Sequence, residues 1–344
     1  MRTNIKSTLL LLMTAMIWGF AFVAQLESAD KIGSFTFNGL RFTLGSLSLI
    51  PVIMLFDRAK LDKAQWLRHI KCGIIAGVIL FLAAALQQIG IVITNSAGKS
   101  GFITGLYTVL VPVIGFVFLK RRNSINIWLG SIFAVIGLFM LCILGSATNS
   151  GGEMSENAGK IVEYIHNASS SPAMYESIGI ILMLIGSVLW ALHIIFVDSV
   201  INEMRPLRFS AVQFAVCGSL SLIAMTFTEF GGIATLSGQI KDAVIPICYG
   251  AFLSVGVAYT CQTIGQKNAD PTFAAILMST ESVFSALGEM IFYAVILKRA
   301  DYVGMGAWGY AGCAVIFAGI VISQLDFSSK KRAENKRIEK EPVS

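Results

Sequence analysis

The sequence contains little charge. Only 13% of its 344 residues are Asp, Glu, Lys or Arg, whereas 55% are hydrophobic and the mean hydropathy is +0.74. This composition is too apolar for a soluble globular domain. The sequence also lacks the segments of about ten residues, alternately apolar and polar, from which membrane β-barrels are built. We therefore expect an all-α integral membrane protein.

Motifs that would support catalysis are also missing. There is no GxSxG or HExxH motif and no P-loop, and the six cysteines show no CxxC spacing. These absences predict a protein that is not an enzyme and uses no cofactor or metal site, with an intramembrane enzyme as the disfavoured alternative. Without a P-loop, direct use of ATP is not expected either.

The apolar residues form ten runs, each close to the length of about 20 residues that a helix needs to cross the hydrocarbon. The first run is an alternative candidate for a cleaved signal peptide, but it is long and no Ala-x-Ala site follows it. We interpret it as the first permanent helix. The runs cover residues 7–26, 34–56, 70–92, 100–119, 127–144, 177–199, 209–227, 244–264, 273–297 and 303–324.

Basic residues predict the orientation, because cytoplasmic loops retain Lys and Arg. A cytoplasmic N-terminus places 19 of the 26 basic residues on the cytoplasmic side. The expected protein is multi-pass in the plasma or inner membrane with both termini in the cytoplasm. The net charge of +6 is spread among short loops, which argues against a nucleic-acid partner.

Two positions in the first half return in the second half, 172 residues later. Trp18 returns as Trp190, and Arg41-Phe42 returns as Gln213-Phe214. Because five crossings is an odd number, a second unit of five helices enters from the opposite side and forms an inverted repeat. We expect a first repeat at 7–145, an extracytoplasmic linker at 146–176, a second repeat at 177–325 and a disordered basic cytoplasmic tail at 326–344.

Two inverted halves allow two similar states, one open to each side, which is the geometry of alternating access. Duplication also occurs in channels, so a channel or a substrate-sensing membrane protein remains an alternative. Saturable counter-transport would distinguish a carrier from a channel.

The chain resembles the EamA-type branch of the drug/metabolite transporter superfamily from about Ser7 to Gln324. The segments that support the resemblance include Ile17-Trp18-Gly19, Phe35-Thr36-Phe37-Asn38-Gly39-Leu40-Arg41-Phe42, Leu86-Gln87-Gln88-Ile89-Gly90, Val111-Pro112, Leu189-Trp190-Ala191-Leu192-His193 and Ser279-Thr280-Glu281. The resemblance implies a ten-helix transporter that carries small organic metabolites, often outward, around a central cavity. A Gly-Glu pair that members often have near the ends of helices four and nine is replaced here by Leu119-Lys120 and Ala294-Val295, so no role of that pair is transferred.

Ionisable residues within the apolar runs are candidates for a site, because an unpaired charge at bilayer depth costs several kcal/mol. We expect Glu281 to bind a proton or a cationic part of the substrate and Arg41 to tune it, the alternative being a static buried ion pair. His193 is a candidate for hydrogen bonding or proton transfer, although a satisfied structural histidine is the commoner case.

Aromatic and neutral polar residues complete the candidate set. Trp18 and Trp190 offer flat apolar contacts or cation–π attraction to an amine. Others can hydrogen-bond a polar ligand or, alternatively, join helices. These are Gln87, Gln213, Tyr107 and Tyr259.

The sequence thus predicts a secondary transporter, most simply an exporter, of amino acids, related metabolites or organic cations. The expected partners are the lipid bilayer, a small-molecule substrate and protons as coupling ion, and a homodimer is compatible with this interpretation. Uptake or exchange in place of export stays open, because topology does not fix the net direction.

Overall fold

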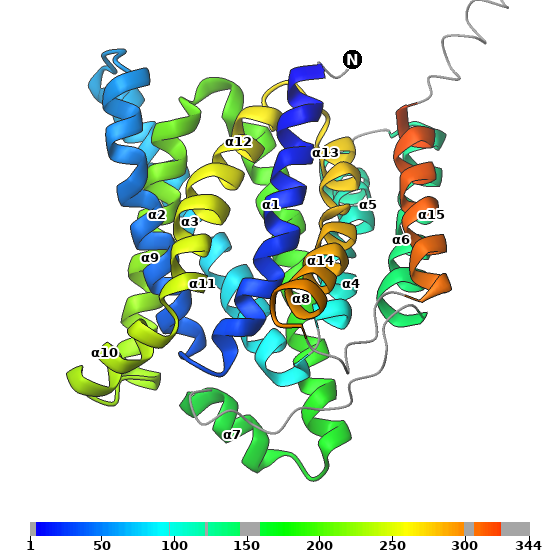
Figure 1. Cartoon of the computed structure of the whole chain (residues 1–344). Helices are drawn as coiled ribbons and strands as arrows, with labels where there is room; N and C mark the ends of the chain where they lie inside the picture. The colour runs from blue at the N-terminus through cyan, green and yellow to red at the C-terminus, as the bar shows by residue number, and fades with distance from the viewer. Residues whose placement is uncertain (1–4, 96, 121–122, 145–158, 299–305, 325–344) are drawn as a thin grey trace, which may run out of the picture.

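The computed structural model describes residues 5–95, 97–120, 123–144, 159–298 and 306–324, which form a bundle of helices without any strand. Most of the helices run between the upper and lower ends of the bundle in the view of Figure 1. The all-α prediction is confirmed for these residues.

Eight helical stretches are long and apolar enough to cross a membrane, and the chain is a multi-pass membrane protein. Two further apolar helices, at 125–139 and 307–323, are shorter. All ten predicted runs overlap helices within the described residues, which do not include 303–305 of the last run. A count of ten crossings stays a prediction. The uninterrupted helices are α1 (Ile5–Ala29), α2 (Ser34–Phe56), α3 (Lys63–Thr94), α8 (Pro172–Val200), α9 (Pro206–Thr228) and α15 (Ala307–Gln324).

Four runs that we expected as single helices are divided or change their winding. In the fourth run the break lies at Leu106, next to Gly105, while Pro112 lies inside the following helix. The parts are α4 (Ala97–Gly105) and α5 (Tyr107–Leu119); α6 (Ile125–Phe139) and η1 (Met140–Leu144); α11 (Val244–Cys248), the π-helical η3 (Tyr249–Tyr259) and α12 (Thr260–Gln266); and α13 (Pro271–Met278), α14 (Glu281–Met290) and the π-helical η4 (Ile291–Ile296).

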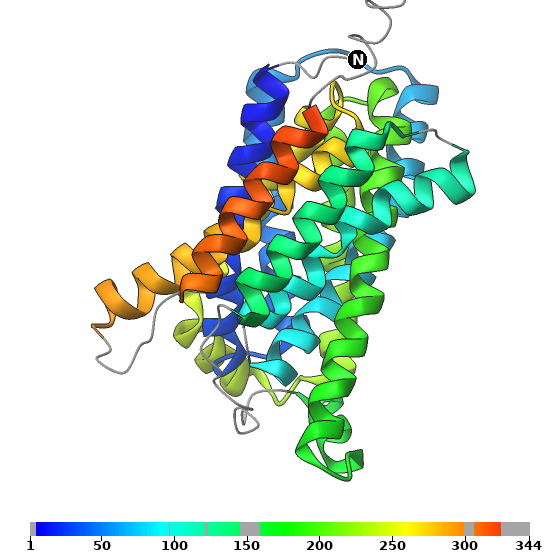
Figure 2. The same cartoon turned by 90° about the vertical axis from the view of Figure 1, so that its right-hand side faces the viewer.

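The two halves of the chain enter the bundle from opposite ends. Helix α1 starts at the upper end, where the N-terminus lies, whereas α8 rises from the lower end after the short helix α7 (Lys160–Ala168) (Figures 1 and 2). Helix α10 (Ile233–Asp242) also lies at the lower end. Residues 146–158 of the predicted linker and the predicted tail at 326–344 lie outside the described residues.

The largest buried cluster joins both halves at the centre of the bundle. It includes Phe42 from α2, Trp190 from α8, Phe214 from α9 and Tyr259 from η3. Phe42 and Phe214, which are 172 positions apart, have ring centroids 6.2 Å from one another. Residues that are equivalent in the two halves therefore meet in the core.

Helices α6 and α15 pack side by side at one side of the bundle (Figure 1). Glycines allow their backbones to approach closely, because a Cβ atom at Gly137 would lie 2.7 Å from the carbonyl oxygen of Gly312. The same kind of contact occurs seven residues earlier in α6, where a Cβ atom at Gly130 would lie 2.7 Å from the carbonyl oxygen of Gly319. Small residues at such contacts are typical of helix pairs in membranes.

We expect Gly137→Ala to destabilise the protein by about 1–3 kcal/mol. The new methyl group would meet backbone atoms of α15, which cannot shift without moving the helix. Gly238→Ala is the matched control, since a Cβ atom there has no neighbour within 4 Å and alanine favours a helix. The thermal midpoint of each purified variant in one detergent checks this. Equal midpoints would show that the α6–α15 contact is not tight.

Candidate functional site

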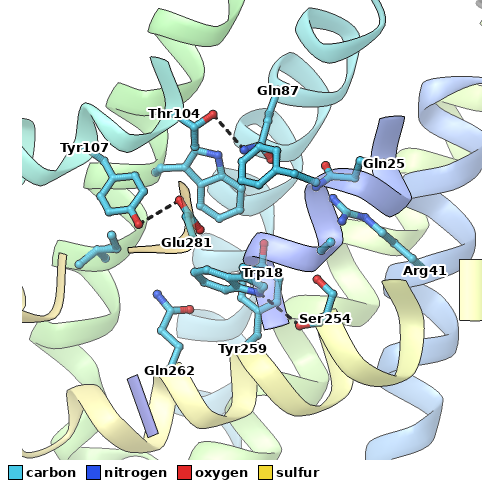
Figure 3. Close-up of a pocket in the computed structure, with 14 residues that line it drawn as sticks. Trp18, Gln25, Arg41, Gln87, Thr104, Tyr107, Ser254, Tyr259, Gln262 and Glu281 are labelled. Atoms are coloured by element: carbon cyan, nitrogen blue, oxygen red, sulfur yellow. Dashed lines mark hydrogen bonds between the residues drawn. The ribbon is translucent and has the colours of Figure 1, made fainter. Parts of the chain in front are cut away.

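A cavity of ≈ 30 Å³ lies at the centre of the bundle, and both halves of the chain contribute to its wall (Figure 3). Its wall combines aromatic rings, amides and two residues of opposite charge. The lining residues are Trp18, Ala21, Phe22, Gln25, Arg41, Gln87, Thr104, Tyr107, Trp190, Ile194, Ser254, Tyr259, Gln262 and Glu281.

Seven of the nine residues predicted from the sequence line this cavity. They are Trp18, Arg41, Gln87, Tyr107, Trp190, Tyr259 and Glu281. His193 and Gln213 are not among the lining residues. The roles of all nine in binding or coupling stay predictions.

Glu281 occupies the point where the ninth apolar run is interrupted. It is the first residue of α14, it is buried, and its Oε1 accepts a hydrogen bond of 3.1 Å from the hydroxyl of Tyr107. Tyr107 is itself the first residue of α5, directly after the break at Leu106. Two interrupted helices, one from each half, therefore meet through this hydrogen bond, and the helix N-terminus presents partial positive charge to the carboxyl of Glu281.

Arg41 is buried in α2 without a carboxylate partner. Its Nε donates to Oδ1 of Asn38 at 2.9 Å, and its guanidinium carbon lies 4.8 Å from the ring centroid of Phe42 and 5.2 Å from that of Phe37. The two terminal nitrogens make no hydrogen bond to the described residues, and none of the ion pairs there includes Arg41 or Glu281.

The direct Arg41–Glu281 ion pair considered from the sequence is therefore absent among the described residues. Figure 3 shows the two side chains on different sides of Trp18. The cavity thus presents a cation and a carboxyl group at separate places on its wall. A ligand with both charges could contact both groups.

Three aromatic rings form one wall of the cavity. Trp18 lies edge-on to Tyr259 with ring centroids 4.6 Å apart, and Trp190 stacks on Tyr259 at 6.1 Å with 25° between the planes. The indole of Trp18 donates to the backbone carbonyl of Ser254 at 3.4 Å, which fixes its orientation. Trp18 and Trp190, the equivalent residues of the two halves, are 6.3 Å apart.

Several polar atoms of the lining residues have no partner. Gln87 donates to Thr104 Oγ1 at 3.1 Å. In contrast, Gln25 Oε1, Trp190 Nε1 and Gln262 Nε2 are buried and make no hydrogen bond to the described residues. Buried polar atoms are normally hydrogen-bonded, so these three require water or a polar ligand in the cavity.

His193 and Gln213 form a structural pair behind the aromatic wall. Nε2 of His193 lies 2.9 Å from Oε1 of Gln213, and both side chains are fully buried. The imidazole also contacts Trp190 edge-on, with centroids 6.1 Å apart. In this structure, their contact with the cavity is indirect, through Trp190.

Thr104 and Ser254 line the cavity but were not singled out from the sequence. Small hydroxyl residues are common in membrane helices, where they usually bond to the backbone or pack against neighbouring helices. Ser254 contributes its backbone carbonyl to the contact with Trp18, and side-chain chemistry gives no sign of that role.

The cavity has room for water but not for an organic metabolite. Protein interiors are close-packed, so a metabolite can enter only when the surrounding helices separate. In this structure the central cavity is therefore too small to hold a metabolite.

Comparison with known protein families agrees with this arrangement. The model of the EamA-like transporter family matches the chain twice, at residues 5–143 and 177–323. The chain belongs to the EamA-like transporter family. The two matches begin 172 positions apart, the same spacing that separates Trp18 from Trp190. This EamA-like protein is thus an internally duplicated membrane transporter, for which a small-molecule substrate and the lipid bilayer are the implied partners.

Relatives of similar length are also described as transporters. Two Archaeoglobus fulgidus proteins, each described as "Uncharacterized transporter", are 27% and 23% identical to this chain. The matches cover 86% of this chain and 80% of the first relative, and 88% of this chain and 94% of the second. A solved structure described as "Crystal structure of protein" has a TM-score of 0.67 and 16% identity, covering 92% of this chain and 96% of the other, which shows a shared fold.

We expect His193→Phe to lower stability without weakening substrate binding. The substitution leaves buried Gln213 unpaired, which costs about 1–3 kcal/mol, and neither residue lines the cavity. The double variant His193→Phe/Gln213→Leu should lose less stability than the sum of the two single variants. Thermal midpoints and KM values of all three variants check this. A raised KM with unchanged midpoints would instead place His193 in the binding site.

Proposed function

We propose that this EamA-like transporter is a proton-coupled exporter of small zwitterionic metabolites, with amino acids as the first class to test. It is proposed to lie in the plasma membrane with both termini in the cytoplasm. The observation on which the proposal depends is that Arg41 and Glu281 line one cavity without pairing with each other.

A zwitterion matches the chemistry of this cavity. The free nitrogens of the Arg41 guanidinium suit a substrate carboxylate, since charge-assisted hydrogen bonds are among the strongest in proteins. Glu281 suits an ammonium group, and the faces of Trp18 and Tyr259 attract the same cation. An anion or a cation alone would leave one of the two charged groups without a partner, which costs free energy in a dry site.

Coupling follows if a proton and the ammonium group compete for Glu281. When Glu281 is protonated, it is neutral and holds no ammonium; when the substrate ammonium is bound, the proton has left. Exchange of one proton for one zwitterion moves one net charge across the membrane. An inward proton gradient therefore drives export, and the exchange generates a measurable current.

Alternating access requires two related states, and three observations support an inverted repeat of five plus five helices. The family matches are offset by 172 positions, α1 and α8 begin at opposite ends of the bundle, and the equivalent residues Trp18 and Trp190 meet at its centre. A central cavity too small for a metabolite favours a carrier over a channel, because an open pore would need a continuous water path. Uptake or exchange by the same cycle is the alternative.

The test uses purified protein in liposomes that contain a pH-sensitive dye. Labelled alanine and phenylalanine, an organic cation, a sugar and a nucleoside are offered with an imposed proton gradient. We expect saturable flux of the amino acids with a matching proton flux in the opposite direction. Flux of the sugar or nucleoside alone would contradict the zwitterion proposal.

Glu281→Gln should abolish the response of alanine transport to the proton gradient, because the amide of glutamine does not take up and release a proton as a carboxyl group does. Glu289→Gln is the matched control, since Glu289 lies in the same helix but outside the cavity lining. Alanine flux at several gradients, measured for both variants and the wild type, checks this. If Glu281→Gln transports normally and keeps its pH dependence, the coupling mechanism is wrong.

Arg41→Gln should weaken binding of alanine by roughly tenfold to a hundredfold, because it removes charge-assisted hydrogen bonds worth about 1.5–3 kcal/mol. The methyl ester of alanine has no carboxylate, so its binding should change little. Inhibition of alanine flux by each unlabelled compound measures both affinities. Equal weakening of the two ligands would mean that Arg41 supports the fold instead of a carboxylate.

A further inference from the structure

Helices α2 and α9 lie side by side along their whole length, in opposite directions (Figure 1). The contact between them is close. Gly39 of α2 faces Leu222, Gly218 of α9 faces Thr43, and the hydroxyl of Ser46 donates to the carbonyl of Ala211 at 2.8 Å. A carboxylate fastens the pair at each end.

At the lower end, Glu229 caps the N-terminus of α2. Helix α2 begins after Gly33, which has no side chain to satisfy the first free N–H groups of the helix. Glu229, the residue that follows α9, takes this role: its Oε1 accepts from the Phe35 N–H at 2.9 Å, and its Oε2 accepts from the Thr36 N–H at 2.8 Å and the Thr36 hydroxyl at 2.7 Å.

Burial, hydrogen bonds and the absence of a side chain at Gly33 all favour this position of the Glu229 carboxylate. The side chain is mostly buried, and burial raises its pKa while the hydrogen bonds from Phe35 and Thr36 oppose the shift. A Cβ atom at Gly33 would collide with the carboxylate, although the backbone of Gly33 has an ordinary negative φ of −63°. An alanine at Gly33 would therefore displace the Glu229 carboxylate, without any strain from the backbone conformation.

At the upper end, Asp57 performs the corresponding role for α9. Asp57 directly follows α2, and its carboxylate lies 3.2 Å from Arg205 Nη1 and 3.1 Å from Arg208 Nε, in ion pairs that lack hydrogen-bond geometry. Arg208 Nη2 also donates to the backbone carbonyls of Asp57 at 2.6 Å and Ala59 at 2.7 Å. Arg205 and Arg208 belong to the N-terminal turn of α9.

The two contacts are related by the internal duplication. Asp57 and Glu229 are 172 positions apart, and so are Thr36 and Arg208. In both cases, the carboxylate after one helix holds the first turn of the partner helix. The same device therefore occurs once at each end of the pair, with different donors.

The pair lies at the edge of the cavity. Helix α9 contributes no residue to the cavity lining, and α2 contributes only Arg41. Separation of α2 from α9 would thus break many contacts without opening the cavity to either side.

We propose that Asp57 and Glu229 act as positioning residues that fasten α2 to α9 at both ends, so that the two helices move as one body while the cavity opens and closes. The pair then holds Arg41 at a fixed place, and access to the cavity opens between other helices. Both carboxylates act through the position of Arg41 and contact no substrate.

Distances between spin labels test this proposal without any substrate. With the native cysteines replaced, labels at Met54 and Ala215 report the upper part of the α2–α9 pair, and labels at Lys31 and Thr226 report the lower end. In wild-type protein in lipid nanodiscs, we expect one narrow distance for each pair of labels at both pH 5.5 and pH 8.0. A second distance in wild-type protein at either pH would overturn the proposal.

Substitutions should release one end at a time. Glu229→Gln and Gly33→Ala should each shift and broaden the lower distance while the upper one is unchanged, and Asp57→Asn should do the reverse. Glu163→Gln is the control, because Glu163 is an exposed acid of α7 and makes none of the hydrogen bonds that cap the N-terminus of α2. Unchanged distances in Glu229→Gln, Gly33→Ala and Asp57→Asn would also overturn the proposal.

Transport of labelled alanine provides a second readout, which rests on the proposed function. Loosening of α2 displaces Arg41, so Gly33→Ala should raise the KM for alanine by about tenfold, the loss of one charge-assisted hydrogen bond, with little change in maximal rate. A lower maximal rate at constant KM would contradict a positioning role. If wild-type protein transports no alanine, that result counts against the proposed substrate. The distances between the spin labels still decide the role of Asp57 and Glu229.

Discussion

Hydrocarbon offers no hydrogen-bond partners, and this constraint determines where the chain can be helical, where it can break and where it can place a charge. At Leu106 and at Ser279–Thr280 the regular helical winding is interrupted, and the backbone turns through tighter hydrogen bonds from the Leu106 N–H to the Ile103 carbonyl and from the Thr280 N–H to the Leu277 carbonyl. Such breaks are tolerated where they are covered by protein or line a cavity, and here Tyr107 and Glu281 begin the helices that follow them and line the central cavity. The breaks, the buried charges and the cavity are therefore one arrangement.

The two halves place equivalent positions symmetrically, but the side chains at those positions differ. Trp18 and Trp190 occupy equivalent positions and both line the cavity, whereas Arg41 lines it and its equivalent Gln213 bonds to His193 behind the wall. The charge on one side of the cavity thus has no counterpart on the other. This asymmetry gives a ligand a preferred orientation, which two identical halves could not do.

Much of the fold was predictable because hydropathy reports directly on burial in lipid. The predicted run 34–56 coincides with α2, and the family matches confirm the duplication. The sequence also pointed to seven cavity residues, since polar and aromatic side chains within apolar runs are costly unless they face one another. It did not reveal which way each side chain points, and so it grouped His193 with the cavity and considered Arg41 as a direct partner of Glu281. Depth along a helix follows from residue number, but rotation about the helix axis depends on how all the helices pack.

Glu229 is a residue whose contacts could not be predicted from the sequence. It lies outside every apolar run, where an acidic residue is ordinary, and nothing in the sequence near it indicates that its partner is the first turn of a helix almost 200 positions earlier. Only the 172-residue offset to Asp57 links the two carboxylates. If α2 and α9 stay together, access to the cavity must open where its wall is formed by other helices, which include α1, α4, α5, α8, η3, α12 and α14. Helices α4–α5 and α13–α14 are already interrupted at the level of the cavity, so rotation there breaks fewer backbone hydrogen bonds than bending an intact helix would. The hydrogen bond between Tyr107 and Glu281 joins these two breaks, so a proton or an ammonium group that changes the partner of Glu281 acts at the point where the wall can bend most easily.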